Sequence, residues 1–198
     1  ISDLKINYQL LEKLMPRYYA IFVNKNAKPS LNDKNILTAL NLATDKNKII
    51  EKIFDGKSLV VNGPLLPVID GYDSASDPGN EFSLEKANKL LDESKWLLNA
   101  ETGMREKKIG KQNEILEFSI IVPQIQFLTE TVDILKDDWS KIGVKLNPII
   151  LNPADIANEV IKTRNYQMII FGNILRNNPD IFSFWHSTER FYPGLNLA

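Results

Sequence analysis

Four residues with amide or guanidinium side chains interrupt a strongly apolar stretch late in the sequence: Asn173, Arg176, Asn177 and Asn178. They follow the apolar run 168–171 and precede an aromatic, helix-like segment. Amide and guanidinium groups form hydrogen bonds, but none of them is a nucleophile. The pattern therefore indicates ligand binding rather than catalysis, and an ordinary solvated connection between two elements is the alternative.

The predicted elements on either side place this polar segment at the end of a strand. We expect a strand from Tyr166 to Phe171 and a helix that begins near Asp180. The Asp180 carboxylate is predicted to cap that helix by accepting backbone N–H groups. In open α/β sheets, ligands bind outside the carboxyl ends of the strands. This placement supports the binding interpretation.

The histidine and cysteine content argues against nucleophilic and metal chemistry. His186 is the only histidine and the chain has no cysteine. A thiolate nucleophile is therefore excluded, and so is a typical zinc or nickel site built within this chain. No Gly-x-Ser-x-Gly stretch is present to form a nucleophile elbow around a serine. His186 is expected to be a packed or surface residue.

Two further patterns have ordinary structural interpretations. The Gly-Lys-Ser stretch at 56–58 resembles the end of a phosphate-binding loop, but that motif requires a glycine where this chain has Glu51. Asp137 and Asp138 are adjacent on a predicted helix, and we expect them to belong to its solvated face. The sequence therefore predicts no catalytic residue, no cofactor and no metal site.

The composition is that of an ordinary globular protein. The 198 residues are 43% hydrophobic and 25% charged, with a net charge of −1. Positive and negative residues are interspersed, which argues against a nucleic-acid-binding surface. No apolar run approaches the roughly 20 residues of a membrane helix. The sequence begins at Ile1 without a signal peptide, so we expect an internal piece of a longer protein.

The clearest predicted unit is a strand–helix–strand segment. A strand over 115–122 is followed by a helix, and Gly143 stands where a left-handed helix cap belongs. A second strand, 144–150, comes next, so the two strands are expected to be parallel. The helix carries these apolar residues on one face: Leu128, Val132, Leu135, Trp139 and Ile142.

Other elements follow from capping residues and hydrophobic periodicity. Asp33 and Ser83 are predicted to cap helices, and the apolar face of the second of these helices is expected to include Leu98. A hairpin is predicted to turn near Gly110. The remaining predictions are strands over 4–10 and 18–23, a helical stripe over 49–54, a long irregular connection over 62–82 and a helix over 153–162.

Several of these stretches, in order, resemble motifs of the peptide/nickel-type (family 5) extracellular solute-binding proteins of ABC importers. The resemblance extends from residue 14 to residue 198 and covers part of the family's length. The stretches that carry it are 14–24, 31–46, Gly63-Pro64 with Pro67, 83–96, 139–144, Asn178-Pro179-Asp180 and Gly194-Leu195-Asn196.

The resemblance implies an α/β fold in which helices flank a mixed sheet, as one lobe of a two-lobe, type II periplasmic-binding-protein-like protein. Residues 1–198 would form a single lobe, the second of a longer protein, without the first lobe. The implied function is that of the substrate-binding component of an ABC importer, which captures an oligopeptide or a similar small polar solute and delivers it to the permease. A non-transport interaction or sensor domain built on the same lobe is the alternative.

The resemblance also implies a location and a site. The whole protein would lie outside the cytoplasmic membrane, in the periplasm or at the cell surface, and a lipid anchor outside this fragment would attach it. Peptide-binding members have an aspartate after the strand that pairs with the peptide amine, whereas this chain has no carboxylate between Phe171 and Asp180. Arg176 suits a carboxylate or another acceptor instead. The expected ligand contacts are Asn173, Arg176, Asn177 and Asn178.

Overall fold

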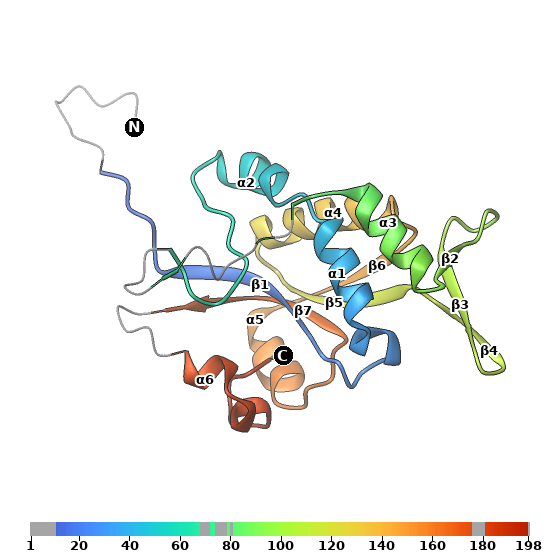
Figure 1. Cartoon of the computed structure of the whole chain (residues 1–198). Helices are drawn as coiled ribbons and strands as arrows, with labels where there is room; N and C mark the ends of the chain where they lie inside the picture. The colour runs from blue at the N-terminus through green and yellow to red at the C-terminus, as the bar shows by residue number, and fades with distance from the viewer. Residues whose placement is uncertain (1–10, 68–71, 74–78, 80, 176–180, 198) are drawn as a thin grey trace.

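A four-stranded mixed sheet forms the centre of the protein (Figure 1). The computed structural model describes residues 11–67, 72–73, 79, 81–175 and 181–197. The strand order is β1-β7-β5-β6, with β1 at Arg17–Val23, β5 at Glu117–Pro123, β6 at Lys145–Leu151 and β7 at Met168–Ile174. β5 runs parallel to β6 and to β7, whereas β1 is antiparallel to β7. The predicted mixed sheet is therefore confirmed.

The predicted strand–helix–strand unit connects β5 and β6 through α4 (Gln126–Ser140). The parallel register runs from the pair Glu117 and Lys145 to the pair Pro123 and Leu151. Gly143 has the predicted left-handed backbone, with φ of +73°. A side chain there would also collide with its neighbours, because a Cβ atom would lie 2.7 Å from the Leu98 Cδ1 atom. The turn between α4 and β6 therefore requires glycine.

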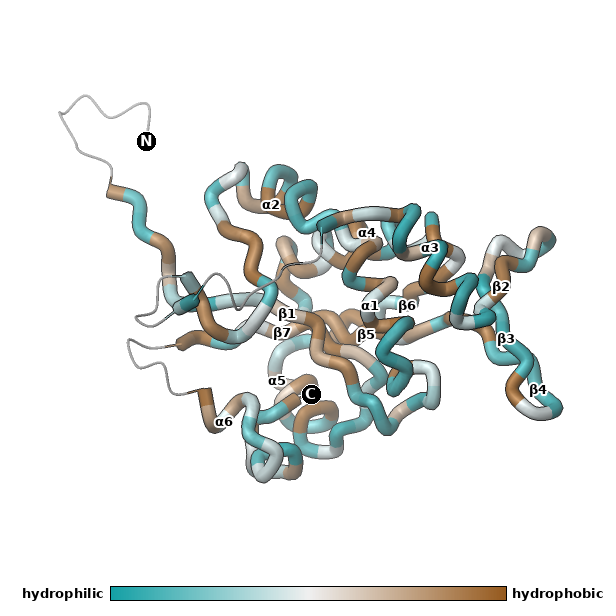
Figure 2. Tube along the Cα trace, in the orientation of Figure 1, coloured by the Kyte–Doolittle hydropathy of each residue, from teal (hydrophilic) through white to brown (hydrophobic). Residues whose placement is uncertain are grey.

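Helices cover both faces of the sheet (Figure 1). On one face lie α1 (Lys34–Leu42), α2 (Lys46–Phe54), α3 (Leu84–Glu93) and α4. Phe118 and Ile120 of β5 pack there against Trp139 of α4. On the other face lie α5 (Pro153–Asp155), the π-helical turn η3 (Ile156–Ile161) and α6 (Phe182–Trp185). Figure 2 shows that the strands at the centre are mostly hydrophobic, as a doubly covered sheet requires.

The helices on the first face begin where the sequence predicts. The Asp33 carboxylate accepts from the backbone N–H of Asn35 at 2.9 Å and caps α1. The Ser83 hydroxyl accepts from the backbone N–H of Lys86 at 3.2 Å and caps α3. Both caps satisfy backbone donors that a helix leaves unpaired at its first turn. The capping predictions are confirmed.

A small antiparallel sheet projects from the main body (Figure 1) and consists of β2 (Leu97–Leu98), β3 (Arg105–Ile109) and β4 (Gln112–Ile115). Arg105, only 2% exposed, anchors it. Its guanidinium donates to the Trp96 carbonyl at 2.5 Å and to the Asp92 carboxylate at 2.6 Å. The short helical turns η1 (Pro29–Asn32) and η4 (Ser187–Arg190) complete the regular elements that the structure describes.

Three predicted boundaries are wrong. Leu98 lies in β2 and is exposed, because α3 ends at Glu93. Ile115 belongs to the hairpin strand β4, so β5 begins at Glu117. β7 continues to Ile174 instead of ending at Phe171, because β1 pairs with it along its whole length. Tertiary pairing therefore extends this strand through residues with low strand propensity.

Some predictions fall on residues that the structure does not describe. The predicted strand over 4–10 lies outside the described residues, and so does part of the 62–82 connection. The described residues of that connection, 62–67, 72–73, 79 and 81–82, form no helix or strand. Within the described part of the chain, no helix is long and apolar enough to cross a membrane.

A candidate ligand-binding edge of the sheet

The structure describes only one of the four predicted site residues. Arg176, Asn177, Asn178 and the predicted capping residue Asp180 lie outside the described residues. Asn173 is described, and it lies in β7, one residue before the end of the strand. The parallel strands β5, β6 and β7 have their carboxyl ends at this edge of the sheet, together with the first residue of β1. This is the edge at which open α/β sheets bind ligands.

The pairing of β1 with β7 fixes the position of Asn173. The register places Asn173 opposite Tyr18, and Gly172 opposite Tyr19. Gly172 allows the Tyr19 ring to approach the backbone, since a Cβ atom there would lie 2.5 Å from the ring atom Cε1. Asn173 itself is 5% exposed. A polar side chain so deeply buried requires a hydrogen-bond partner.

The Tyr18 hydroxyl supplies that partner. Its oxygen accepts a hydrogen bond of 2.9 Å from the Asn173 Nδ2 atom and a second of 2.9 Å from the Trp185 Nε1 atom. Burial raises the pKa of the Tyr18 hydroxyl above its ordinary value of 10.0, and the two hydrogen bonds oppose that shift. The hydroxyl is therefore neutral at physiological pH. It joins β1, β7 and α6 without a charge.

A cavity of about 670 Å³ lies beside β1 and also reaches Met168 and Ile170 of β7. Its walls come from β1, α1, α2 and α4, together with the segment 57–67. This segment leads from α2 to Val61 and Leu66, which pack on the opposite face of the sheet, so it passes outside β1 (Figure 1). Tyr18 and Trp185 also line the cavity. The hydrogen-bonded hydroxyl and the cavity are therefore parts of one region.

Aromatic rings form the wall of the cavity near the candidate edge. The Tyr19 ring meets the Phe127 ring edge to face at a centroid distance of 5.0 Å, and Phe127 meets Phe54 at 5.7 Å. The Arg17 guanidinium lies 5.9 Å from the centroid of the Tyr19 ring. Among the described residues, the charged side chains of the lining are all basic: Lys13, Arg17, Lys46 and Lys57. The region favours apolar groups and acceptor oxygens over cations.

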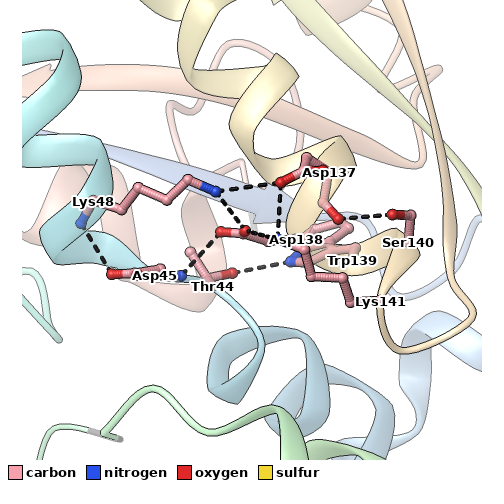
Figure 3. Close-up of polar contacts among 8 residues, drawn as sticks. All are labelled: Thr44, Asp45, Lys48, Asp137, Asp138, Trp139, Ser140 and Lys141. Carbon is pink, nitrogen blue, oxygen red and sulfur yellow. Dashed lines mark hydrogen bonds and ion pairs between the residues drawn. The ribbon is translucent and has the colours of Figure 1, made fainter.

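Phe54 and Phe127 join one end of α2 to one end of α4. At the other end of these two helices, ion pairs join them (Figure 3). The Asp138 carboxylate contacts the Lys48 ammonium at 2.9 Å and the Lys141 ammonium at 3.1 Å, and it accepts from the backbone N–H of Asp45. The expectation that Asp138 lies on a solvated face is wrong, because it is 1% exposed. Asp137 does have an exposed side chain, yet it contacts the same two lysines. The two carboxylates therefore converge.

This ionic cluster has a structural role, because it joins α2 to α4. Hydrogen bonds raise the pKa of Lys48, chiefly through Asp138, and the pKa of Lys141, chiefly through Asp137. The same contacts lower the pKa of Asp137, with Lys141 as the largest cause. The Trp139 indole beside them donates to the Thr44 hydroxyl at 2.9 Å. The two carboxylates and the two ammonium groups neutralise one another, so all four are paired within the cluster.

The described residues contain no group of three or more histidine, cysteine, aspartate or glutamate side chains that could hold a metal ion. His186 is exposed, and its ring stacks on Phe182 at a centroid distance of 4.2 Å. The predicted strand over 18–23 includes Tyr18, but the sequence pattern indicates no partner for its hydroxyl. The sequence contains no signal for these hydrogen bonds, since the partners of Tyr18 lie 155 and 167 residues away.

Comparison with known proteins gives a consistent family assignment. Residues 2–191 match the family described as "Bacterial extracellular solute-binding proteins, family 5 Middle". The chain is 34% identical to the oligopeptide-binding protein OppA of Lactococcus lactis subsp. cremoris over 124 residues, which are 62% of this chain and 20% of OppA. It is 32% identical to heme-binding protein A of Haemophilus influenzae over 148 residues, 74% of this chain and 24% of that protein.

Solved structures show the same fold. The oligopeptide-binding protein AppA of Bacillus subtilis, in complex with a nonapeptide, superimposes with a TM-score of 0.83 at 23% identity, over 93% of this chain and 36% of AppA. NikZ of Campylobacter jejuni, in complex with Ni(L-His), gives a TM-score of 0.78 at 22% identity, over 94% of this chain and 36% of NikZ. The fold is that of one α/β region of a type II periplasmic binding protein.

The chain spans only a fifth to about a third of the length of the curated relatives that it matches. The family match, by contrast, covers nearly all of the chain. The chain belongs to family 5 of the bacterial extracellular solute-binding proteins.

Proposed function

We propose that the chain is the second lobe of a longer, two-lobe binding protein that captures an oligopeptide or a similar small polar solute. The complete protein delivers this solute to the membrane subunits of an ABC importer. It works outside the cytoplasmic membrane, and a lipid anchor outside residues 1–198 attaches it. The family match and the names of the oligopeptide-binding relatives support this proposal.

The observation that carries the proposal is the edge of the sheet at which β7 ends. Amide and hydroxyl groups meet there at Asn173 and Tyr18, beside a cavity lined by aromatic rings. We propose that Asn173, Arg176, Asn177 and Asn178 contact the solute, and that the Arg176 guanidinium pairs with a carboxylate or a carbonyl oxygen. These groups hold a ligand without altering it, so the protein acts as a carrier rather than as an enzyme.

Two lobes would share the ligand. Binding proteins of this architecture close by a hinge, and the ligand favours closure only by binding the closed state more tightly. A dissociation constant of 1 μM corresponds to about −8 kcal/mol. If half of the contacts come from this lobe, the 198 residues alone should bind at about millimolar concentration or more weakly.

The test uses the intact two-lobe protein. Native mass spectrometry of the purified protein should detect co-purified peptide. Calorimetry should then show binding to a mixed-sequence nonapeptide or pentapeptide pool, since solved relatives hold peptides of these lengths. Nickel–histidine and heme serve as competing probes, because relatives with those ligands also match. Binding of either probe without binding of any peptide would contradict the peptide assignment.

A further inference from the structure

One phenolic oxygen connects two side chains that belong to different elements of the candidate site. Asn173 lies at the carboxyl end of β7, and Trp185 lies in α6, on the far side of the segment that follows β7. Both donate to the Tyr18 oxygen at 2.9 Å. A hydroxyl oxygen has two lone pairs, so these two donors fully occupy it as an acceptor.

The surroundings make this arrangement rigid. Tyr18 and Asn173 are each 5% exposed, so water cannot readily replace either bond. The Tyr18 ring is fixed by the pairing of β1 with β7, and the Trp185 ring packs against Phe22 at a centroid distance of 5.8 Å. The hydroxyl therefore determines the orientation of the Asn173 carboxamide and of the Trp185 indole.

We propose that Tyr18 is the positioning residue of the ligand site. By binding the Asn173 Nδ2 atom, it fixes the rotation of the carboxamide, and so the direction in which the Oδ1 atom can accept a hydrogen bond from a peptide N–H. By engaging the Trp185 Nε1 atom, it holds the indole ring as part of the cavity wall. This inference rests on the proposed function, because it assumes that the solute occupies this edge of the sheet.

The chain offers a matched control for the effect of removing a buried tyrosine hydroxyl. Tyr166 is 7% exposed, and its hydroxyl donates to the Leu197 carbonyl at 2.7 Å. It precedes β7, so it lies at the opposite edge of the sheet from Asn173. Burial raises its pKa as it raises that of Tyr18. Tyr166→Phe thus removes a similar group from the same hydrophobic cluster but away from the candidate site.

The experiment compares Tyr18→Phe with Tyr166→Phe in the intact protein. Calorimetry with the mixed nonapeptide pool measures affinity, and thermal unfolding measures stability. Both variants should lose stability. Tyr18→Phe should also weaken peptide binding by about tenfold, because two buried donors lose their acceptor and the side chains reorient. Tyr166→Phe should change affinity by less than about twofold.

The outcomes separate this inference from the proposed function. If the wild-type protein binds the nonapeptide pool and both variants retain its affinity, Tyr18 is only a structural residue and the inference is overturned. If Tyr166→Phe weakens binding as much as Tyr18→Phe, the loss reflects general destabilisation, which also overturns it. If the wild-type protein binds no peptide at all, the proposed function fails before the variants are compared.

Discussion

The two ends of the α2–α4 pair are held by different chemistry. At the end shown in Figure 3, Asp138 contacts Lys48 and Lys141 in a closed ionic cluster. At the other end, Phe54 and Phe127 meet beside the Tyr19 ring and line the cavity. The helices are thus joined by ion pairs at one end and by contacts between aromatic rings at the other end, where the rings line the cavity.

This difference separates stability from binding. A buried carboxylate is costly unless its partners stay in place, so the ionic end fixes the position of α2 relative to α4. Aromatic rings have few rotatable bonds and present large apolar surfaces, so the other end can contact an apolar ligand group at little cost in conformational entropy. Substitutions at the ionic end should therefore change mainly stability, and those at the aromatic end should also change binding.

The largest expected effect is on stability, from Asp138→Ala. Removing a buried carboxylate with several donors should lower the free energy of unfolding by about 2–3 kcal/mol. We expect less than the full penalty of a broken buried pair, because Lys48 and Lys141 are 25% and 41% exposed and can be hydrated. Urea unfolding monitored by tryptophan fluorescence measures the change.

The adjacent Asp137 is the control for this substitution, because it contacts the same lysines but its side chain is 60% exposed. Asp137→Ala should have a much smaller effect on unfolding, since solvent already screens its ion pairs. Equal effects of the two substitutions would show that burial of Asp138 is not what makes the ionic end stable.

Phe127→Ala should affect both quantities. Its ring is partly buried between Tyr19 and Phe54, so truncation should cost about 2 kcal/mol of unfolding free energy, below the range for a fully buried phenylalanine. It also removes part of the cavity wall, so calorimetry should show weaker binding of the nonapeptide pool. Phe191→Ala, at a ring that is 74% exposed, should leave both unchanged. Unaltered affinity in Phe127→Ala would contradict the expectation that the aromatic end contributes to binding.

Arg176→Ala should change binding alone. Loss of a guanidinium that pairs with a ligand acceptor should weaken binding of the nonapeptide pool by about tenfold, or about 1.4 kcal/mol, in the intact protein. Arg176→Lys should recover only part of the loss, because lysine cannot form the bidentate contact. Thermal unfolding should stay nearly unchanged. A large loss of stability with full affinity would remove Arg176 from the site.

The smallest expected effect is the pH dependence of the ionic end. The pKa of Asp137 is lowered in the folded state, so its contribution to stability is present above the unfolded value of 3.8 and is lost as the pH falls below it. The pKa values of Lys48 and Lys141 are raised, so their contributions are lost as the pH rises above 10.5. Asp137→Asn should reduce the acid-side loss in unfolding experiments; an identical acid profile would exclude this contribution.

Local signals in the sequence predicted much of the fold. The caps at Asp33 and Ser83 and the left-handed Gly143 each depend on neighbouring residues, and all three are confirmed. The parallel β5–α4–β6 unit followed from hydrophobic periodicity in the same way. Predictions failed where residues that are distant in the sequence determine whether a side chain is buried. Asp138 is buried because Lys48, 90 residues earlier in the sequence, neutralises it.

The candidate site was predictable only in part. The polar residues after an apolar strand predicted a site at the carboxyl end of that strand, and Asn173 lies there, but its contact with a ligand stays a prediction. Sequence periodicity could not reveal that a strand would continue through Gly172 and Asn173, because β1 imposes that pairing. It also could not reveal the role of Tyr18, since an aromatic residue in a strand has the same pattern whether or not its hydroxyl has partners.

The register of β1 has a consequence for how the 198 residues behave by themselves. Backbone hydrogen bonds run from Asn24 N–H to the Gln167 carbonyl and from Leu175 N–H to the Pro16 carbonyl. In this register, the backbone N–H and C=O groups of the even-numbered residues of β1 point toward β7. The backbone groups of the odd-numbered residues therefore point away from the sheet, toward the cavity. The Arg17 N–H in this row donates to the Met15 carbonyl, and the backbone groups of Tyr19, Ile21 and Val23 continue the outward row. Outward backbone groups on an edge strand are a template for another extended segment. Produced in isolation, the chain should tend to dimerise or aggregate through this border.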